Sequence, residues 1–220
     1  MRVPTAVLIS GRGSNLKALL EASASAGYPA EIVLVVSNIE SAAGLTHART
    51  AGITTHVIPH TSFSRREDFD AALDAALRKA NIELICLAGF MRILSEGFVE
   101  KWQGRLLNIH PSLLPSFKGT RVHERAIESS VRISGCTVHF VTAEKDSGPP
   151  IAQAAVPVHC DETAESLAHR VLAAEHRLYP AALKLVAEGR ARLVSGAAVF
   201  QEYRSSGDML INPAEISSNR

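Results

Sequence analysis

The sequence lacks both an excess of charge and a long hydrophobic run. Its 23 Lys and Arg residues are balanced by 22 Asp and Glu residues, giving a formal net charge of +1. Nucleic-acid-binding proteins normally carry a basic excess that attracts phosphates, so dedicated binding to DNA or RNA is not expected. The longest apolar runs, residues 32–36 and 84–88, are five residues long, whereas a membrane-spanning helix needs about 20. A membrane partner is not expected either.

Cysteine is also scarce. Cys86, Cys136 and Cys160 are odd in number and widely spaced, without a Cys-x-x-Cys pair, a pattern that favours reduced thiols over a disulfide framework. We expect all three in or near the core. The largely apolar segment of residues 3–9 is too short for a signal peptide, and no small-residue cleavage pattern follows it. A cytoplasmic location is therefore expected.

The remaining composition is typical of a globular domain. Hydrophobic residues make up 46% of the 220-residue chain and charged residues 20%, far from the polar composition of disordered chains. Because domains usually contain about 100–200 residues, one domain is expected. We assign residues 1–204 to it and residues 205–220 to a polar C-terminal tail.

Short apolar runs alternate with helix-like segments. Strands are predicted at residues 5–10, 32–37, 54–58 and 83–88, and helices at residues 15–26, 41–51 and after Ser64, which has Glu67 three positions on, as in a capping box. Apolar strands separated by helices indicate an α/β fold, a doubly wound, mostly parallel sheet with helices on both faces, which is Rossmann-like. A long helix is predicted at residues 163–188, with Pro180 as a candidate break.

Ligands of such sheets bind beside the carboxyl ends of the strands, here at residues 11–15, 89–94, 108–119 and 142–148. The first loop contains Gly11, Gly13, Ser14 and Asn15 before a helix, where free backbone N–H groups and the helix dipole favour a phosphate. It is not a dinucleotide fingerprint, since Leu16 replaces the third Gly and no acidic residue follows at the required spacing. A Gly turn that merely permits tight packing is an equal alternative.

The strand predicted at residues 105–109 leads into a polar loop stiffened by two prolines. Asn108 and His110 alternate onto one face at its end. A His titrates near neutral pH and an Asn amide can stabilise an oxyanion, which suits attack on a carbonyl. Asp146 is the best candidate for a carboxylate that orients the His. An isolated His or an Asp before Ser-Gly-Pro is more often structural, so spacing alone leaves these roles open.

Four segments spread over nearly the whole chain form a specific combination of motifs. They are residues 7–15 (VLISGRGSN), residues 87–94 (LAGFMRIL), residues 106–115 (LLNIHPSLLP), and residues 138–149 with Val-His-Phe-Val-Thr, Asp146 and Gly148-Pro149. With them, the chain resembles the phosphoribosylglycinamide formyltransferase family. The resemblance implies an enzyme of purine biosynthesis that transfers the formyl group of 10-formyltetrahydrofolate to the amine of 5-phosphoribosylglycinamide.

The resemblance also implies roles for individual residues. Asn108, His110 and Asp146 match the family's catalytic trio. Gly13, Ser14 and Asn15 would hold the substrate phosphate, and Glu175 would contact the rest of that substrate. The folate pocket would comprise Arg66, Met91, Arg92, Ile93, Leu94, Thr142, Ala143, Glu144 and Lys145. The bond matching Leu114-Pro115 is cis in the family. No metal is expected, because the formyl donor is already activated, and a homodimer stays open.

Departures and alternatives remain. Ala143 and Lys145 replace an acidic and an aliphatic residue of the family pattern, and Arg121 stands where a His is common, which puts folate affinity in doubt. A methionyl-tRNA formyltransferase would need a further domain for which 220 residues leave no room. A formyltetrahydrofolate hydrolase usually adds an N-terminal regulatory domain and is the second choice. A non-catalytic phosphate-binding module would explain the Gly loop but not the trio.

Overall fold

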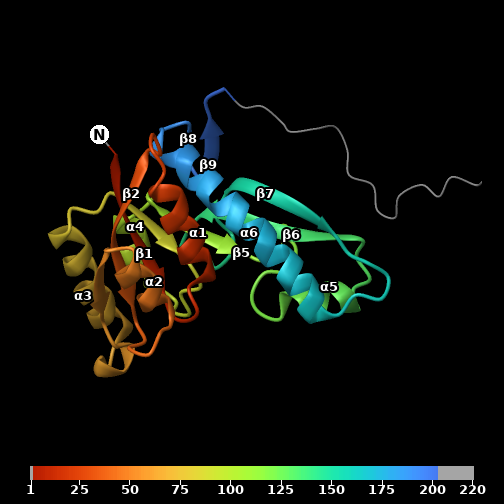
Figure 1. Ribbon diagram of the computed structural model, residues 1–220, viewed down its shortest axis with the longest axis horizontal. Coiled ribbons are helices and arrows are strands. Elements are labelled where there is room, and N and C mark those ends of the chain that lie inside the picture. The colour runs from red at the N-terminus through yellow and green to blue at the C-terminus, as the bar shows by residue number, and fades with distance from the viewer. Residues whose placement is uncertain (1, 203–220) are drawn as a thin grey trace, which may run out of the picture.

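The computed structural model describes residues 2–202, and its centre is one seven-stranded sheet (Figure 1). Its strands are Val3–Ile9 (β1), Ala30–Ser37 (β2), Thr54–Val57 (β3), Leu84–Leu87 (β4), Leu106–His110 (β5), Ile133–Phe140 (β6) and Pro150–Pro157 (β7). Their spatial order is β3-β2-β1-β4-β5-β6-β7. Neighbouring strands are parallel from β3 to β5, whereas β6 is antiparallel to both β5 and β7. The predicted mostly parallel α/β fold is confirmed.

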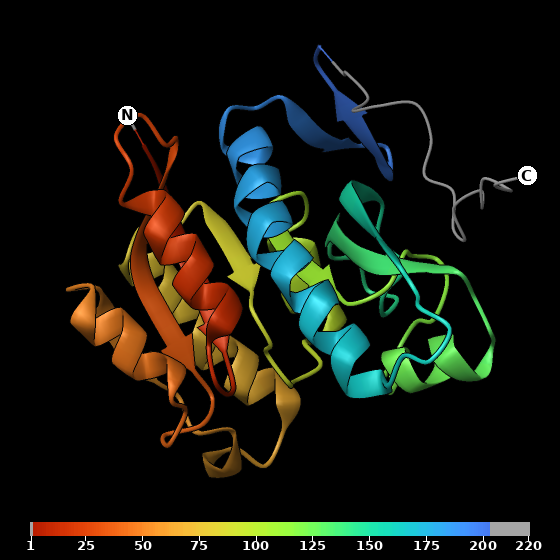
Figure 2. The same cartoon turned by 45° about the vertical axis from the view of Figure 1, so that its right-hand side comes forward.

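Helices cover both faces of this sheet. They are Ser14–Ser23 (α1), Gly44–Thr50 (α2), Arg66–Lys79 (α3), Glu96–Lys101 (α4), Val122–Glu128 (α5) and Ala164–Ala187 (α6), with a 3₁₀ turn at His60–Ser62 (η1). Side chains of α1, α2 and α6 pack on one face, and those of α3 and α4 pack on the other. Figure 2 shows α1 and α6 side by side on the same face of the sheet.

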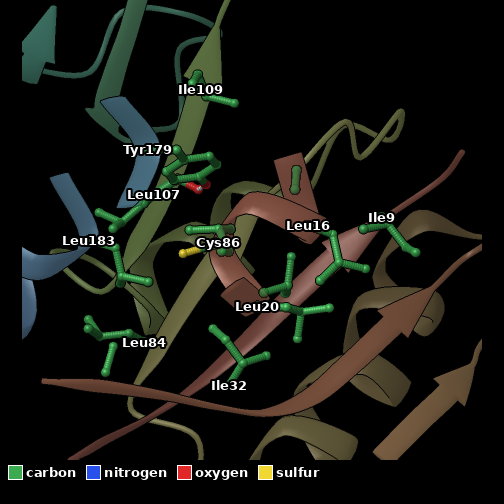
Figure 3. Packing of buried hydrophobic residues seen from close by; sticks show 14 of the residues in the cluster. Ile9, Leu16, Leu20, Ile32, Leu84, Cys86, Leu107, Ile109, Tyr179 and Leu183 are labelled. Carbon is green, nitrogen blue, oxygen red and sulfur yellow. Dashed lines mark hydrogen bonds between the residues drawn. The ribbon is translucent and has the colours of Figure 1, made fainter. Parts of the chain in front are cut away.

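Strand β1 shows why the central strands are continuously apolar. Val7 and Ile9 pack beneath α1 and α6, whereas Ala6 and Leu8 pack beneath α3, and all four are fully buried. Successive strand residues point to opposite faces, so a strand covered on both sides needs apolar residues at every position. Figure 3 shows the first of these two clusters, in which side chains from α1 and α6 meet over the strands.

Three local predictions are wrong. Ser64 does not cap α3, because the helix begins at Arg66 and its N-cap residue, Arg65, makes no side-chain capping bond. α6 continues through Pro180, since a single lost backbone hydrogen bond is outweighed by the buried packing of its neighbours, such as Tyr179 and Leu183. Cys160 is exposed in the connection between β7 and α6, which runs over the surface, whereas Cys86 and Cys136 are buried.

Several elements have no counterpart among the predictions. They include β7, α4, α5 and a hairpin of Ala191–Val194 (β8) with Ala197–Phe200 (β9). The hairpin turns at Ser195 and Gly196, whose φ angles of 49° and 81° are the positive values that a two-residue turn needs. The predicted domain boundary at residues 204 and 205 lies outside the described residues. Within residues 2–202, no helix combines the length and hydrophobicity of a membrane-crossing segment.

Candidate functional site

The three predicted catalytic side chains lie together where β5 ends. His110 Nδ1 is 3.5 Å from Asp146 Oδ1, and both side chains are buried. His110 Nε2 is 3.0 Å from the carbonyl oxygen of Phe117. Both ring nitrogens therefore face oxygen acceptors, and a doubly protonated, positively charged ring satisfies both contacts. The Leu114–Pro115 peptide bond that follows is cis, as the resemblance implied.

Asp146 reaches His110 by a route that differs from the prediction. Because β6 is antiparallel to β5, it ends beside Leu106, where Val141 N donates to Leu106 O at 2.9 Å. The loop after β6 therefore starts at the far end of β5. The prediction that it starts beside the other strand-end loops is wrong. It turns back to place Asp146 at His110, with Asp146 in the left-handed region at a φ of 52°. Asp146 Oδ2 also accepts a hydrogen bond of 2.9 Å from Gly119 N.

Asn108 is held by His139, a residue to which the sequence assigned no role. Asn108 Nδ2 is 3.1 Å from His139 Nε2, and His139 Nδ1 is 2.9 Å from the Phe140 carbonyl oxygen. A carbonyl oxygen only accepts, so Nδ1 carries the proton and Nε2 accepts from the Asn108 amide. Burial lowers the pKa of His139 below its usual value of 6.5 and so favours this neutral ring. The second N–H of the Asn108 amide can then serve a ligand.

The Gly loop between β1 and α1 needs its second glycine. Gly13 has a φ of 75°, and a Cβ added there would lie 2.6 Å from the Cα of Gly44, closer than real Cβ atoms come. The chain therefore turns tightly against α2 before α1 starts at Ser14. The first N–H groups of a helix have no partner within the helix, so this turn directs donors to the predicted phosphate position.

Asn15 and Glu175 join α1 to α6 beside this loop. Asn15 Nδ2 donates to Glu175 Oε2 at 2.7 Å, whereas Asn15 Oδ1 is buried without a partner in the described part of the chain. Burial raises the pKa of Glu175, and the hydrogen bond from Asn15 offsets part of that rise. An orphaned buried acceptor beside a perturbed carboxyl group suits a ligand that supplies N–H or O–H donors.

A cavity of about 130 Å³ opens beside Asn108 and Asp146. Seven of the nine residues predicted for the folate pocket line it, namely Arg92, Ile93, Leu94, Thr142, Ala143, Glu144 and Lys145. Leu87, Phe90, Val99, His139 and Val141 complete the lining. These five residues were missed because four of them are apolar and resemble ordinary core residues in a sequence, whereas the place of His139 beside Asn108 depends on the pairing of β5 with β6. Within residues 2–202, no three or more His, Cys, Asp or Glu side chains are grouped so that they could hold a metal.

Two predicted pocket residues are not part of this lining. The Met91 side chain is 81% exposed, and its backbone N–H donates to Ser10 Oγ at 2.7 Å. Arg66 is exposed at the first residue of α3. The structure therefore brings together the trio and most of the pocket, and it leaves these two side chains outside the cavity.

Comparisons with known proteins identify the family of this chain. Residues 2–183 match the model of the formyl transferase family. Phosphoribosylglycinamide formyltransferase of Escherichia coli is 43% identical over 198 residues, which cover 90% of this chain and 93% of that protein. The trifunctional purine biosynthetic protein adenosine-3 of Gallus gallus is 56% identical over 86% of this chain, which spans only 19% of that protein's length.

Solved structures give the same result. Glycinamide ribonucleotide transformylase 1 from Symbiobacterium toebii superposes with a TM-score of 0.88 at 42% identity, covering 91% of this chain and 95% of that one. Phosphoribosylglycinamide formyltransferase from Brucella melitensis gives 0.82 at 50% identity, covering 85% and 96%. The chain therefore belongs to the formyl transferase family. Its resemblance to the phosphoribosylglycinamide formyltransferases is confirmed by these relatives.

Proposed function

We propose that this chain transfers the formyl group of 10-formyltetrahydrofolate to the amine of 5-phosphoribosylglycinamide, a step of purine biosynthesis that gives formylglycinamide ribonucleotide and tetrahydrofolate. The observation that carries the proposal is the contact of His110 with Asp146 beside the cavity that contains Asn108. The names of the relatives support the formyl transfer and its acceptor, and they do not name the formyl donor. The cytoplasmic location and the single domain of residues 1–204 remain predictions from the sequence, and a homodimer stays open.

The phosphorylated amine would bind between the Gly loop and α6. Gly13, Ser14 and Asn15 would hold the phosphate with backbone N–H groups at the start of α1. Glu175 would accept from N–H or O–H groups of the same molecule, with the orphaned Asn15 Oδ1 as a second acceptor. Both acceptors are buried, so a ligand without matching donors would leave them unpaired.

Only one end of the formyl donor would fit inside the cavity. Complete sites for small molecules usually measure about 300–1,000 Å³, whereas this cavity measures about 130 Å³. A bicyclic ring would lie against apolar walls such as Leu87, Phe90 and Val99, and the rest of the donor would extend over exposed residues such as Ile93 and Lys145. The formyl group would then lie near Asn108, which lines the pocket.

The trio would stabilise the tetrahedral intermediate. The amine nitrogen attacks the formyl carbon, a C–N bond forms, and the carbonyl electron pair moves to oxygen. The Asn108 amide and a positively charged His110 stabilise this oxyanion. Asp146 stabilises the charge on His110. The bond to the folate nitrogen then breaks as that nitrogen gains a proton, and the attacking nitrogen loses one, so that no external acid or oxidant is consumed.

The test is consumption of 10-formyltetrahydrofolate by purified protein with and without 5-phosphoribosylglycinamide. We expect consumption only when this acceptor is present, because the Gly loop and the buried acceptors of Asn15 and Glu175 would bind the phosphorylated amine at the site, whereas water has no such binding groups. Consumption without the acceptor would indicate a hydrolase. No consumption under either condition would leave only phosphate binding and would contradict the proposal.

A further inference from the structure

Tyr179 is fully buried, yet its hydroxyl contacts two backbone carbonyl groups. The hydroxyl is 3.1 Å from the carbonyl oxygen of Leu87 and 3.1 Å from that of Leu107. Figure 3 shows the Tyr179 side chain extending from α6 to the strand that carries Leu107 and Ile109. One side chain therefore links α6 to two adjacent strands, β4 and β5.

These two carbonyl groups lie directly behind the candidate site. Leu107 is joined by its carbonyl carbon to Asn108, and the register of the sheet pairs Leu87 with Asn108. The Leu87 side chain lines the cavity. Tyr179 belongs to the core cluster on the other face of the sheet, with Cys86 and Ile109. The hydroxyl thus holds the backbone of Asn108 from the side opposite the cavity.

The surroundings of the hydroxyl are dry and keep it protonated. Burial raises the pKa of Tyr179 well above its usual value. Burial also raises the pKa of the adjacent Cys86 thiol to about 12, although the hydrogen bond with Tyr179 offsets part of that rise. A neutral donor that faces two carbonyl oxygens without competing water makes a stronger bond than it would at the surface.

We propose that Tyr179 is a positioning residue that fixes the Leu107–Asn108 peptide group and thereby aims the Asn108 amide at the reacting carbonyl. The inference rests on the proposed function, in which Asn108 stabilises the oxyanion. A displacement of about 1 Å at a catalytic group can reduce the rate by as much as 10²-fold. The Asn108 side chain is also tied to His139, so the loss of one backbone contact should have a smaller effect.

Tyr179→Phe separates this role from simple packing, because it keeps the ring and removes only the hydroxyl. Tyr28→Phe is the matched control. The Tyr28 hydroxyl also donates to a backbone carbonyl oxygen of α6, that of Pro180, at 2.7 Å. Among the described residues, the Tyr28 hydroxyl makes no hydrogen bond to β4 or β5. Its loss should therefore not change the position of Asn108.

The experiment is steady-state kinetics of formyl transfer well below the thermal midpoint of each variant. For Tyr179→Phe we expect kcat to fall about three- to ten-fold while the KM for 5-phosphoribosylglycinamide changes less than about two-fold. Tyr28→Phe should match the wild type. In an Asn108→Ala background, Tyr179→Phe should cause no further loss of kcat, because its effect passes through Asn108.

Other outcomes overturn the inference. One is a wild-type kcat in Tyr179→Phe. The other is a loss of kcat from Tyr179→Phe that is equally large in the wild-type and Asn108→Ala backgrounds. A variant with 4-aminophenylalanine at position 179 keeps a donor and should retain kcat within about two-fold. If the Phe variant does not fold, this variant decides alone, since a kcat loss with a wild-type thermal midpoint would exclude the positioning role. An inactive wild type would refute the proposed function, whereas an active wild type with a normal Tyr179→Phe refutes only this inference.

Discussion

The buried His110 ring lies between two oxygen acceptors. Its two nitrogens face Asp146 Oδ1 and the carbonyl oxygen of Phe117, and neither partner can donate when the carboxyl group is ionised. A neutral ring would leave one of these contacts unsatisfied. Asn108 complements it as an uncharged donor whose orientation His139 fixes. In the proposed mechanism, Asn108 would donate to the oxyanion and His110 would stabilise it by its charge.

Substitution at either residue should be severe. Loss of one oxyanion donor lowers kcat by about 10²- to 10³-fold in measured enzymes, so we expect a fall of that size in both Asn108→Ala and His110→Ala. His169→Ala, at an exposed position of α6, is the control and should keep wild-type kcat. Steady-state kinetics with circular dichroism checks both activity and folding. Near-normal turnover in either site variant would contradict the assigned roles.

His139 should make the folded state sensitive to acid. Burial lowers its pKa from the usual 6.5 in the folded protein, so the unfolded chain takes up the proton first as the pH falls. Stability should therefore be fully present above pH 6.5 and decrease below it. The free energy of unfolding, measured with urea, should decrease less between pH 7.5 and pH 5 in His139→Gln than in the wild type. His123 and His176 shift in the same direction and leave part of the dependence in place. An equal dependence of the free energy of unfolding on pH in the wild type and in His139→Gln would contradict this prediction.

At the scale of elements, the turn between β1 and α1 makes a sharp prediction. Gly13→Ala places a Cβ 2.6 Å from Gly44 Cα at a φ of 75°, and such strain costs about 1–3 kcal/mol. We expect the free energy of unfolding of Gly13→Ala, measured with urea, to fall by that amount. We also expect a higher KM for 5-phosphoribosylglycinamide. Gly11→Ala is the control, because a Cβ there meets nothing within 4 Å. Equal stability of the two variants would show that the close approach is not required.

The predictability of each element follows from its surroundings. β1, β2 and β4 were predicted because burial on both faces requires continuous apolar runs. β7 was missed because its buried and exposed positions alternate irregularly between two terminal prolines, which in a sequence resembles a loop. β8 and β9 are four residues each and largely exposed, so they lack a hydrophobic pattern that could distinguish them.

The candidate site was predictable where its residues are close in the sequence. Asn108 and His110 share a strand end, and the Gly loop follows β1 directly. His139 was not predicted as the partner of Asn108, because that contact depends on the β5–β6 register, which no local pattern encodes. The reversal of the loop after β6 is likewise a tertiary property. The candidate catalytic residues were therefore predictable from the sequence, whereas the contacts that hold them in place were not.

At the scale of the whole molecule, the strand order assembles the site. β1, β4 and β5 are neighbours in the sheet, so the Gly loop, the loop of residues 89–94 and the end of β5 lie along one edge. α6 covers the opposite face of β4 and β5 from the cavity and contributes Glu175 and Tyr179 from one side of the helix. In the proposed function, this one helix would both contact the substrate through Glu175 and support the sheet through Tyr179.

We propose that the trio catalyses the transfer of a formyl group from a folate to a phosphorylated amine. The most direct measurement follows a ¹³C-labelled formyl group by NMR in a mixture of protein, 10-formyltetrahydrofolate and 5-phosphoribosylglycinamide. We expect the label on the glycinamide nitrogen with the wild-type chain, and transfer slower by about 10²-fold or more with Asn108→Ala. Label released as formate, or transfer at the wild-type rate by that variant, would contradict the claim.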